Sequence, residues 1–126
     1  MTMVWEEFHA RRARQNSAIL ATGFPGFRRF FALDGTAYED GALPRKTKEL
    51  IGLAASLVLR CNDCILYHLD QALRSGATRQ EIHETLNIGL IIGGSIVIPY
   101  LRFAIEALEC WQPEKPHAAP DSPPGN

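Results

Sequence analysis

Residues 50–58 have the sequence Leu-Ile-Gly-Leu-Ala-Ala-Ser-Leu-Val, the clearest structural signal in the chain. Apolar side chains recur here at intervals of three and four residues, which places them on one face of an α-helix. The members of this stripe are Leu50, Leu53, Ala54, Leu57 and Val58. The pattern predicts an amphipathic helix that packs this face against a hydrophobic core.

Helical periodicity continues toward the N-terminus, and the alternation typical of β-strands is almost absent. An amphipathic helix is expected from about Trp5 to Leu20, because its apolar residues share one face. The sequence Gly-Phe-Pro-Gly at residues 23–26 ends it. A second helix is expected from near Phe27 to the region of Tyr38.

Local end signals define the helices on the C-terminal side. A fourth helix is predicted from Asn62 to about Arg74, closed by a Ser-Gly pair typical of a helix C-terminus. Thr78 and Glu81 have the spacing of a capping box, so a fifth helix starts there. Two glycines at residues 93 and 94 separate it from a sixth helix. We therefore predict an all-α, single-domain bundle of about six helices over residues 1–111, and a disordered, proline-rich tail over residues 112–126.

The composition is that of an ordinary globular protein. Of 126 residues, 46% are apolar and 21% charged, and the formal net charge is −1. This balance provides no broad electrostatic field for nucleic acid or for an anionic membrane, so neither is expected as a partner. Three arginines close together, Arg11, Arg12 and Arg14, are a local exception. We interpret them as a solvated helix face rather than a partner-binding patch.

No segment of the sequence predicts export or membrane insertion. The first eight residues include Glu6 and Glu7 and lack the pattern of a secretory signal. The most apolar stretch, residues 86–101, is shorter than the roughly 20 residues of a membrane helix, so we expect it to be buried core or a subunit interface. The expected location is cytoplasmic, where ordinary thiols are kept reduced.

A close pair of cysteines carries the main functional signal. Cys61 and Cys64 are separated by two residues at a predicted helix start, where a disulfide can form across one turn. The positive end of the helix dipole stabilises a thiolate there. His68 lies one turn beyond Cys64 on the same side and can take its proton. The spacing favours an attacking thiol, a resolving thiol and a base.

Two other interpretations of these residues remain open at this point. The same three side chains could bind a metal ion in a protein without turnover. Structural zinc takes four protein ligands, and Cys110, Glu49 or His83 would have to provide the fourth from a distance. The cysteines could also be inert core residues.

The motifs around the cysteine pair resemble those of a known family. They are residues 48–54 (Lys-Glu-Leu-Ile-Gly-Leu-Ala), Cys61-Asn62-Asp63-Cys64, His68, Gly76-Ala77-Thr78, Glu81-Ile82 and Gly93-Gly94. This set resembles the alkylhydroperoxidase D branch of the carboxymuconolactone decarboxylase superfamily, and the resemblance covers the motif-bearing core, residues 44–109. It implies a helical subunit that assembles as a homotrimer or homohexamer.

The resemblance also implies a reaction and roles for four residues. The reaction is thiol-dependent reduction of a peroxide, or of a partner disulfide such as that of a peroxiredoxin. A dithiol such as dihydrolipoamide returns the electrons, with no bound cofactor or metal. Cys64 corresponds to the nucleophile and Cys61 to its disulfide partner, while His68 and Glu49 correspond to a proton relay. Peroxidase members have histidine directly before the second cysteine, where this chain has Asp63, a carboxylate that opposes a neighbouring thiolate.

Two further expectations concern this site. On helical rise alone, Glu49 and His68 lie about 8 Å apart along antiparallel helices, a separation that is too long for a direct bond but compatible with a bridging water. The same superfamily also suggests a carboxymuconolactone decarboxylase-like lyase that acts on a small lactone acid. That chemistry requires no cysteine pair, so the presence of Cys61 and Cys64 weighs against it.

Overall fold

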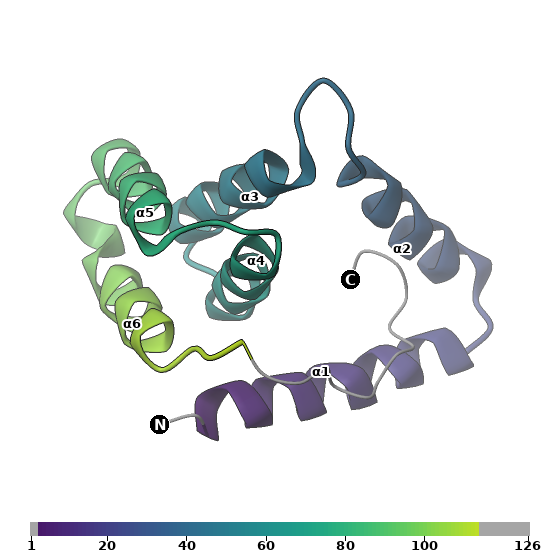
Figure 1. Cartoon of the computed structure of the whole chain (residues 1–126). Coiled ribbons are helices and arrows are strands. Elements are labelled where there is room, and N and C mark those ends of the chain that lie inside the picture. Colours follow the sequence, from purple (N-terminus) through teal and green to yellow (C-terminus); the bar gives the residue numbers. More distant parts are fainter. Residues whose placement is uncertain (1–2, 114–126) are drawn as a thin grey trace.

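The computed structural model describes residues 3–113 and is built from α-helices (Figure 1). In chain order they are α1 (Met3–Ala21), α2 (Pro25–Ala37), α3 (Arg45–Leu59), α4 (Asn62–Arg74), α5 (Arg79–Gly93), the short 3-10 helix η1 (Ser95–Val97) and α6 (Ile98–Glu109). The predicted all-α architecture is confirmed. The tail predicted for residues 112–126 lies outside the described residues from residue 114 onward.

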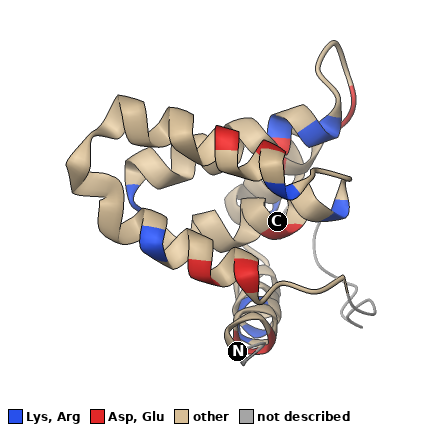
Figure 2. Ribbon diagram, turned by 60° about the vertical axis from the view of Figure 1, so that its left-hand side comes forward, with Lys and Arg blue, Asp and Glu red and all other residues tan. Residues whose placement is uncertain are grey.

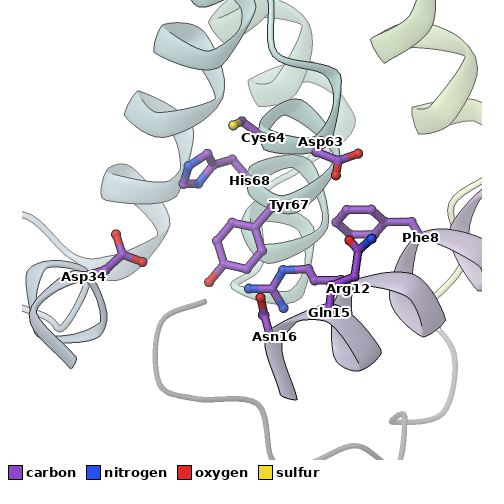
Figure 3. Close-up of a pocket in the computed structure, with 9 residues that line it drawn as sticks. All are labelled: Phe8, Arg12, Gln15, Asn16, Asp34, Asp63, Cys64, Tyr67 and His68. Carbon is purple, nitrogen blue, oxygen red and sulfur yellow. The ribbon is translucent and has the colours of Figure 1, made fainter. Parts of the chain in front are cut away.

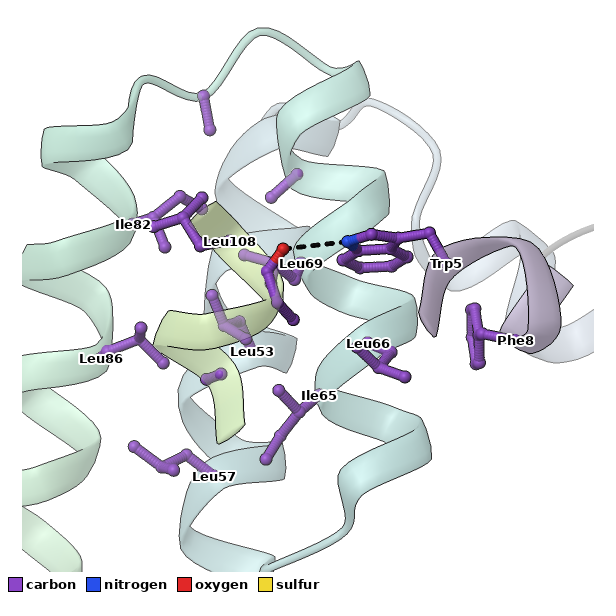
Figure 4. Close-up of a cluster of buried hydrophobic side chains, with 14 of the residues drawn as sticks. Trp5, Phe8, Leu53, Leu57, Ile65, Leu66, Leu69, Ile82, Leu86 and Leu108 are labelled. Carbon is purple, nitrogen blue, oxygen red and sulfur yellow. Dashed lines mark hydrogen bonds between the residues drawn. The ribbon is translucent and has the colours of Figure 1, made fainter. Parts of the chain in front are cut away.

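The core lies between α3, α4, α5 and α6, with the start of α1 packed against it (Figure 4). Each helix contributes apolar residues at helical spacing, as the stripe on α3 predicts. The largest fully buried apolar side chains are Leu53, Leu57, Ile65, Leu69, Ile82, Leu86, Val97 and Leu108. Trp5 fixes α1 to this core, because its indole Nε1 donates to the carbonyl oxygen of Ala107 at 2.9 Å.

The turn between α3 and α4 places the cysteine motif. Arg60 ends α3 with a left-handed backbone (φ 61°, ψ 44°), and the N–H of Cys61 donates to the carbonyl of Ser56 at 3.1 Å. This end pattern reverses the chain within two residues. Cys61 thereby becomes the N-cap of α4, and α4 returns alongside α3 (Figure 1).

The second helix stands apart from the core (Figure 1). Its side chains Phe27, Phe30 and Leu33 are exposed, as is the preceding Phe24. The apolar stretch 86–101 is divided between core and surface. Its buried members are Leu86, Gly89 and Val97, and its exposed large members are Ile88, Ile91, Ile92 and Ile96.

Basic and acidic residues both occur along the helices (Figure 2). Within residues 3–113, no helix combines the length and the apolar character needed to cross a membrane.

A buried carboxylate ties three segments together. Asp70 on α4 accepts hydrogen bonds from His9 Nε2 at 3.2 Å, Arg74 Nε at 3.0 Å and Trp111 Nε1 at 2.8 Å. Burial on its own raises the pKa of Asp70, but the bonds from His9 and Trp111 and the charge of Arg74 outweigh it, so the pKa is lowered. The ionised carboxylate therefore stabilises the fold above its unfolded-state pKa, and this contribution is lost as the pH falls through the lower folded-state value.

We expect Asp70→Asn to lower the free energy of unfolding by about 2 kcal/mol at pH 7, because charge-assisted hydrogen bonds are lost. The difference from the wild type should shrink toward zero as the pH falls below the folded-state pKa of Asp70. Urea titrations followed by tryptophan fluorescence at several pH values measure it. Glu106→Gln on the exposed face of α6 is the matched control. A difference that stays constant with pH would contradict the assignment.

Candidate active site

The two cysteines form a disulfide across the first turn of α4. Cys61 is the N-cap, and its Sγ accepts a hydrogen bond from the backbone N–H of Cys64 at 3.2 Å. Cys64 is exposed and Cys61 half-buried. Negative charge on a sulfur at this end of the helix is stabilised, because the first backbone N–H groups of a helix have no partner within it and carry the positive end of its dipole.

His68 contacts Glu49 directly across the two helices. Its Nδ1 lies 2.9 Å from Oε1 of Glu49, whose side chain is fully buried. An ionised carboxylate only accepts hydrogen bonds, so with Glu49 ionised this bond is donated by Nδ1–H, and a neutral ring then has its lone pair on Nε2. The expectation that these two residues lie too far apart for a direct bond is therefore wrong.

Gly52 explains why the two side chains meet. It lies one turn after Glu49 on α3, and a Cβ placed on it would come within 2.7 Å of Cε1 and Nδ1 of His68. The imidazole thus lies against the bare backbone of α3. A distance based on helical rise ignores this close approach, as well as the length of the two side chains that reach across it.

We expect Gly52→Ala to displace the His68 ring and break its bond to Glu49. Overpacking of this kind lowers the free energy of unfolding by about 1–3 kcal/mol. Urea unfolding measures the loss, and the ring-nitrogen NMR shifts of His68 report the broken bond. Gly41→Ala is the control, because its Cβ would meet nothing closer than Lys48 Nζ at 3.7 Å. Unchanged stability and unchanged His68 shifts in Gly52→Ala would show that the ring is not held in this way.

Arg45 places a positive charge next to the buried carboxylate. Its Nη2 lies 3.2 Å from Oε2 of Glu49, one turn away on α3. The orientation does not make a hydrogen bond, so the contact is one of charge alone. Glu49 therefore has a cation near one oxygen and an imidazole on the other.

Two tyrosines enclose the imidazole. The ring centroids of Tyr38 and Tyr67 lie 5.5 Å and 5.1 Å from that of His68. Burial, with the nearby charge of Glu49, raises the pKa of Tyr67 to about 12. Burial, again with Glu49, raises the pKa of Tyr38. Both phenols are therefore neutral near pH 7, and Tyr67 also lines the pocket beside Cys64.

Cys64 and His68 open into a cavity of about 340 Å³ (Figure 3). The remaining lining residues come from three helices and are Phe8, Arg12, Gln15, Asn16, Asp34, Asp63 and Tyr67. Cys64 and His68 are drawn on the same side of α4 in Figure 3. The pocket joins the thiol and the imidazole at one surface that a small molecule can reach.

The first helix supplies a wall of this pocket, which the sequence analysis missed. The guanidinium of Arg12 lies 4.4 Å from the ring centroid of Tyr67, and Arg11 Nη2 lies 2.8 Å from Asp63 Oδ1. The interpretation of a solvated face is therefore wrong for Arg12, while Arg11 is partly exposed and Arg14 is exposed. The sequence did contain a signal that Arg12 faces inward, because Arg12 lies one turn after the buried Phe8 and shares its face.

The other residues considered from the sequence do not extend the site. His83 is exposed on α5, and the Cys110 thiol donates to the carbonyl of Ala107 at 3.6 Å. Over the described part of the chain, no three histidine, cysteine, aspartate or glutamate side chains are grouped as metal ligands. The grouping of donors gives no support to the metal interpretation.

Solved structures of related proteins have this fold. A crystal structure of a Thermotoga maritima protein is 50% identical, with a TM-score of 0.80 over 82% of this chain and 91% of that chain. A second Thermotoga maritima structure, with a TM-score of 0.77 and 50% identity over 82% of this chain and 87% of that one, is described as a carboxymuconolactone decarboxylase family protein with a suggested involvement in the antioxidative response. A family member from Legionella pneumophila, solved in its apo form, is 36% identical over 80% of this chain and 85% of that chain, with a TM-score of 0.61.

Sequence relatives and a family model agree with this likeness. An uncharacterized Cupriavidus necator protein is 43% identical over 72 residues, which are 57% of this chain and 61% of that protein. A Paracoccus denitrificans protein of the cox locus is 42% identical over 80 residues, 64% of this chain and 72% of that one. The carboxymuconolactone decarboxylase family model matches residues 25–107. The chain therefore belongs to the carboxymuconolactone decarboxylase family.

Proposed function

We propose that this protein is a thiol-dependent oxidoreductase that reduces peroxides through Cys64, with Cys61 as the resolving thiol. The observation that carries the proposal is the shared pocket of Cys64 and His68, with the imidazole held by the buried Glu49. A disulfide on a partner protein, such as a peroxiredoxin, is the second substrate class that suits the same thiol. The suggested antioxidative involvement of the Thermotoga maritima relative agrees with this proposal.

The reduced enzyme begins with a thiolate on Cys64. His68 lies one turn further along α4, so its Nε2 can accept the thiol proton while Glu49 holds Nδ1. The helix N-terminus and the imidazolium then both stabilise the sulfur anion. Cys64 is the more exposed residue of the pair and lines the pocket, which suits it to the attack.

The thiolate attacks one oxygen of the peroxide, and the O–O bond breaks. The sulfur is oxidised to a sulfenic acid, and the departing alkoxide takes the proton that His68 holds, which releases an alcohol, or water in the case of hydrogen peroxide. Cys61 then attacks the sulfur of Cys64. This second step forms the S–S bond found in the structure and releases one water molecule.

An external dithiol completes the cycle. One of its thiolates attacks the Cys61–Cys64 bond and its second thiol closes a ring disulfide, so two electrons and two protons return to the cysteines. A dithiol such as dihydrolipoamide fits this requirement, and no bound cofactor is needed. A cytoplasmic location, which we also propose, would keep such a donor reduced.

Counting free thiols tests the proposal. Reduced protein is treated with one equivalent of peroxide, alkylated and digested, and the peptides are measured by mass spectrometry. We expect the thiols of Cys61 and Cys64 to disappear together and to return after addition of dihydrolipoamide. Cys110 serves as the internal control, because its thiol should remain alkylatable throughout. Free thiols that persist at both positions after peroxide would exclude this chemistry.

We further propose that copies of the chain associate as a homotrimer or homohexamer. The exposed aromatic residues of α2 and the exposed isoleucines of α5 are large apolar side chains that neighbour one another on their helices, as is typical of surfaces that another copy covers. Closed symmetric association would cover both. Sedimentation equilibrium measures the mass of the assembly, and a stable monomer at micromolar concentration would contradict the proposal.

A further inference from the structure

A negative charge lies between the two cysteines. Asp63 directly precedes Cys64 in the first turn of α4 and lines the same pocket (Figure 3). A carboxylate next to a thiol opposes loss of the thiol proton and so reduces the thiolate fraction. This charge has a partner from outside the cysteine motif, because Arg11 Nη2 on α1 lies 2.8 Å from Asp63 Oδ1.

Other charged groups also surround the pocket, and they contribute to the electrostatic potential at Cys64 together with the Arg11–Asp63 pair. His68 lies on α4, and Asp34 faces the pocket from α2. Arg12 lies on α1 over the ring of Tyr67, which stays neutral near pH 7. Among these groups, Asp63 is the one adjacent to Cys64 in the chain. Removing its cation therefore changes the charge next to the sulfur without removing any group that contacts His68.

We propose that Arg11 is a positioning residue for the thiol chemistry: it offsets the charge of Asp63 and thereby raises the thiolate fraction of Cys64. The inference deepens the proposed function and rests on Cys64 being the attacking thiol. It assigns to α1 an electrostatic part in a reaction whose motif residues all lie on α3 and α4. Arg11 lies outside residues 25–107, the part matched by the family model.

The exposure of the pair limits the size of the effect. The side chains of Arg11 and Asp63 are 34% and 64% exposed, so solvent and salt screen their charges. We expect loss of the arginine to raise the midpoint of the Cys64 thiol titration by about half a pH unit. The alkylation rate at pH 7 then falls by about twofold, because a more basic thiolate is scarcer but also more nucleophilic.

The test measures how fast reduced Cys64 reacts with iodoacetamide as a function of pH. Peptide mass spectrometry follows Cys64 separately from the other two cysteines. Arg11→Gln should show the raised midpoint, while Arg11→Lys, which keeps the charge, should stay near the wild type. Arg14→Gln is the matched control, because it removes the same charge from an exposed position on the same helix.

A double-mutant cycle isolates the pair. Asp63→Asn also removes the carboxylate that holds Arg11 at the start of α4, so in that background Arg11→Gln should shift the titration less than in the wild-type background. In the wild-type background the effect should shrink in 0.5 M salt. A wild-type profile for Arg11→Gln, or an equal shift with and without Asp63, would overturn the inference. Alkylation requires no peroxide turnover, so this result is independent of whether the enzyme proves to be a peroxidase.

Discussion

Cys64→Ser should reduce dithiol-dependent peroxide reduction to the uncatalysed background. A serine hydroxyl is far less acidic than a thiol and cannot form the sulfenic acid, so both the attack and the later disulfide are lost. Cys61→Ser should behave differently. It keeps the attacking sulfur, so without added dithiol one equivalent of peroxide is still consumed and a sulfenic acid accumulates. With dithiol present, turnover should be slower than in the wild type, because an external thiol must take the place of Cys61. Peroxide consumption with dihydrolipoamide as donor measures both variants, and a sulfenic-acid trapping reagent identifies the stalled product.

Cys110→Ser is the matched control for these variants. Its thiol is half-buried and bonded to the carbonyl of Ala107, so its loss should leave turnover near the wild-type rate. Peroxide turnover that survives in Cys64→Ser would contradict the assignment of the nucleophile. Conversion of a small lactone acid by a variant that lacks both Cys61 and Cys64 would instead favour the lyase activity suggested by the superfamily.

Glu49→Gln should lower kcat/KM for peroxide by about 10²–10³-fold while the fold is kept. The substitution preserves shape, but the amide can donate to Nδ1 of His68 and so stabilise the tautomer that carries its proton on Nε2. That tautomer cannot accept the thiol proton. General-base catalysis and the orientation of the base by its partner are each worth factors of this size.

Two measurements distinguish this effect on catalysis from a loss of folded structure. Ring-nitrogen NMR shifts of His68 should report a change of tautomer in Glu49→Gln, and circular dichroism should remain that of the wild type. Glu84→Gln, at an exposed position on α5, removes the same charge away from the site. A Glu49→Gln enzyme within about twofold of the wild type would show that the carboxylate does not hold a working base.

Local signals in the sequence were sufficient to predict the helices. The bounds predicted for the fourth helix, Asn62 and Arg74, are those of α4, and the Thr78–Glu81 capping box is present with both of its bonds. These features depend on residues close together in the chain. The disulfide across one turn is local in the same sense, because two residues of an N-terminal turn fix the separation of its sulfurs.

Contacts between distant segments could not be predicted in the same way. The Glu49–His68 bond depends on the approach of α4 to a glycine on α3, and helical rise contains no information about that lateral distance. The Arg11–Asp63 pair joins residues 52 positions apart. His9 received no role from the sequence because its partner, Asp70, comes from another helix. In each case the missing information was which faces of two helices meet.

Successive turns of α4 contribute residues both to the core and to the pocket. Ile65 and Leu69 are buried in the core, while Cys64 and His68, one position earlier in each turn, face the pocket. The opposite wall comes from α1 and α2, and α2 takes little part in the core. Substitutions at the exposed position Gln15 of that wall can therefore alter which molecules fit without disturbing the buried layer, to which Phe8 of the same wall belongs. Substrate choice can therefore change through the exposed residues of this wall while Cys64 and His68 keep their positions on α4.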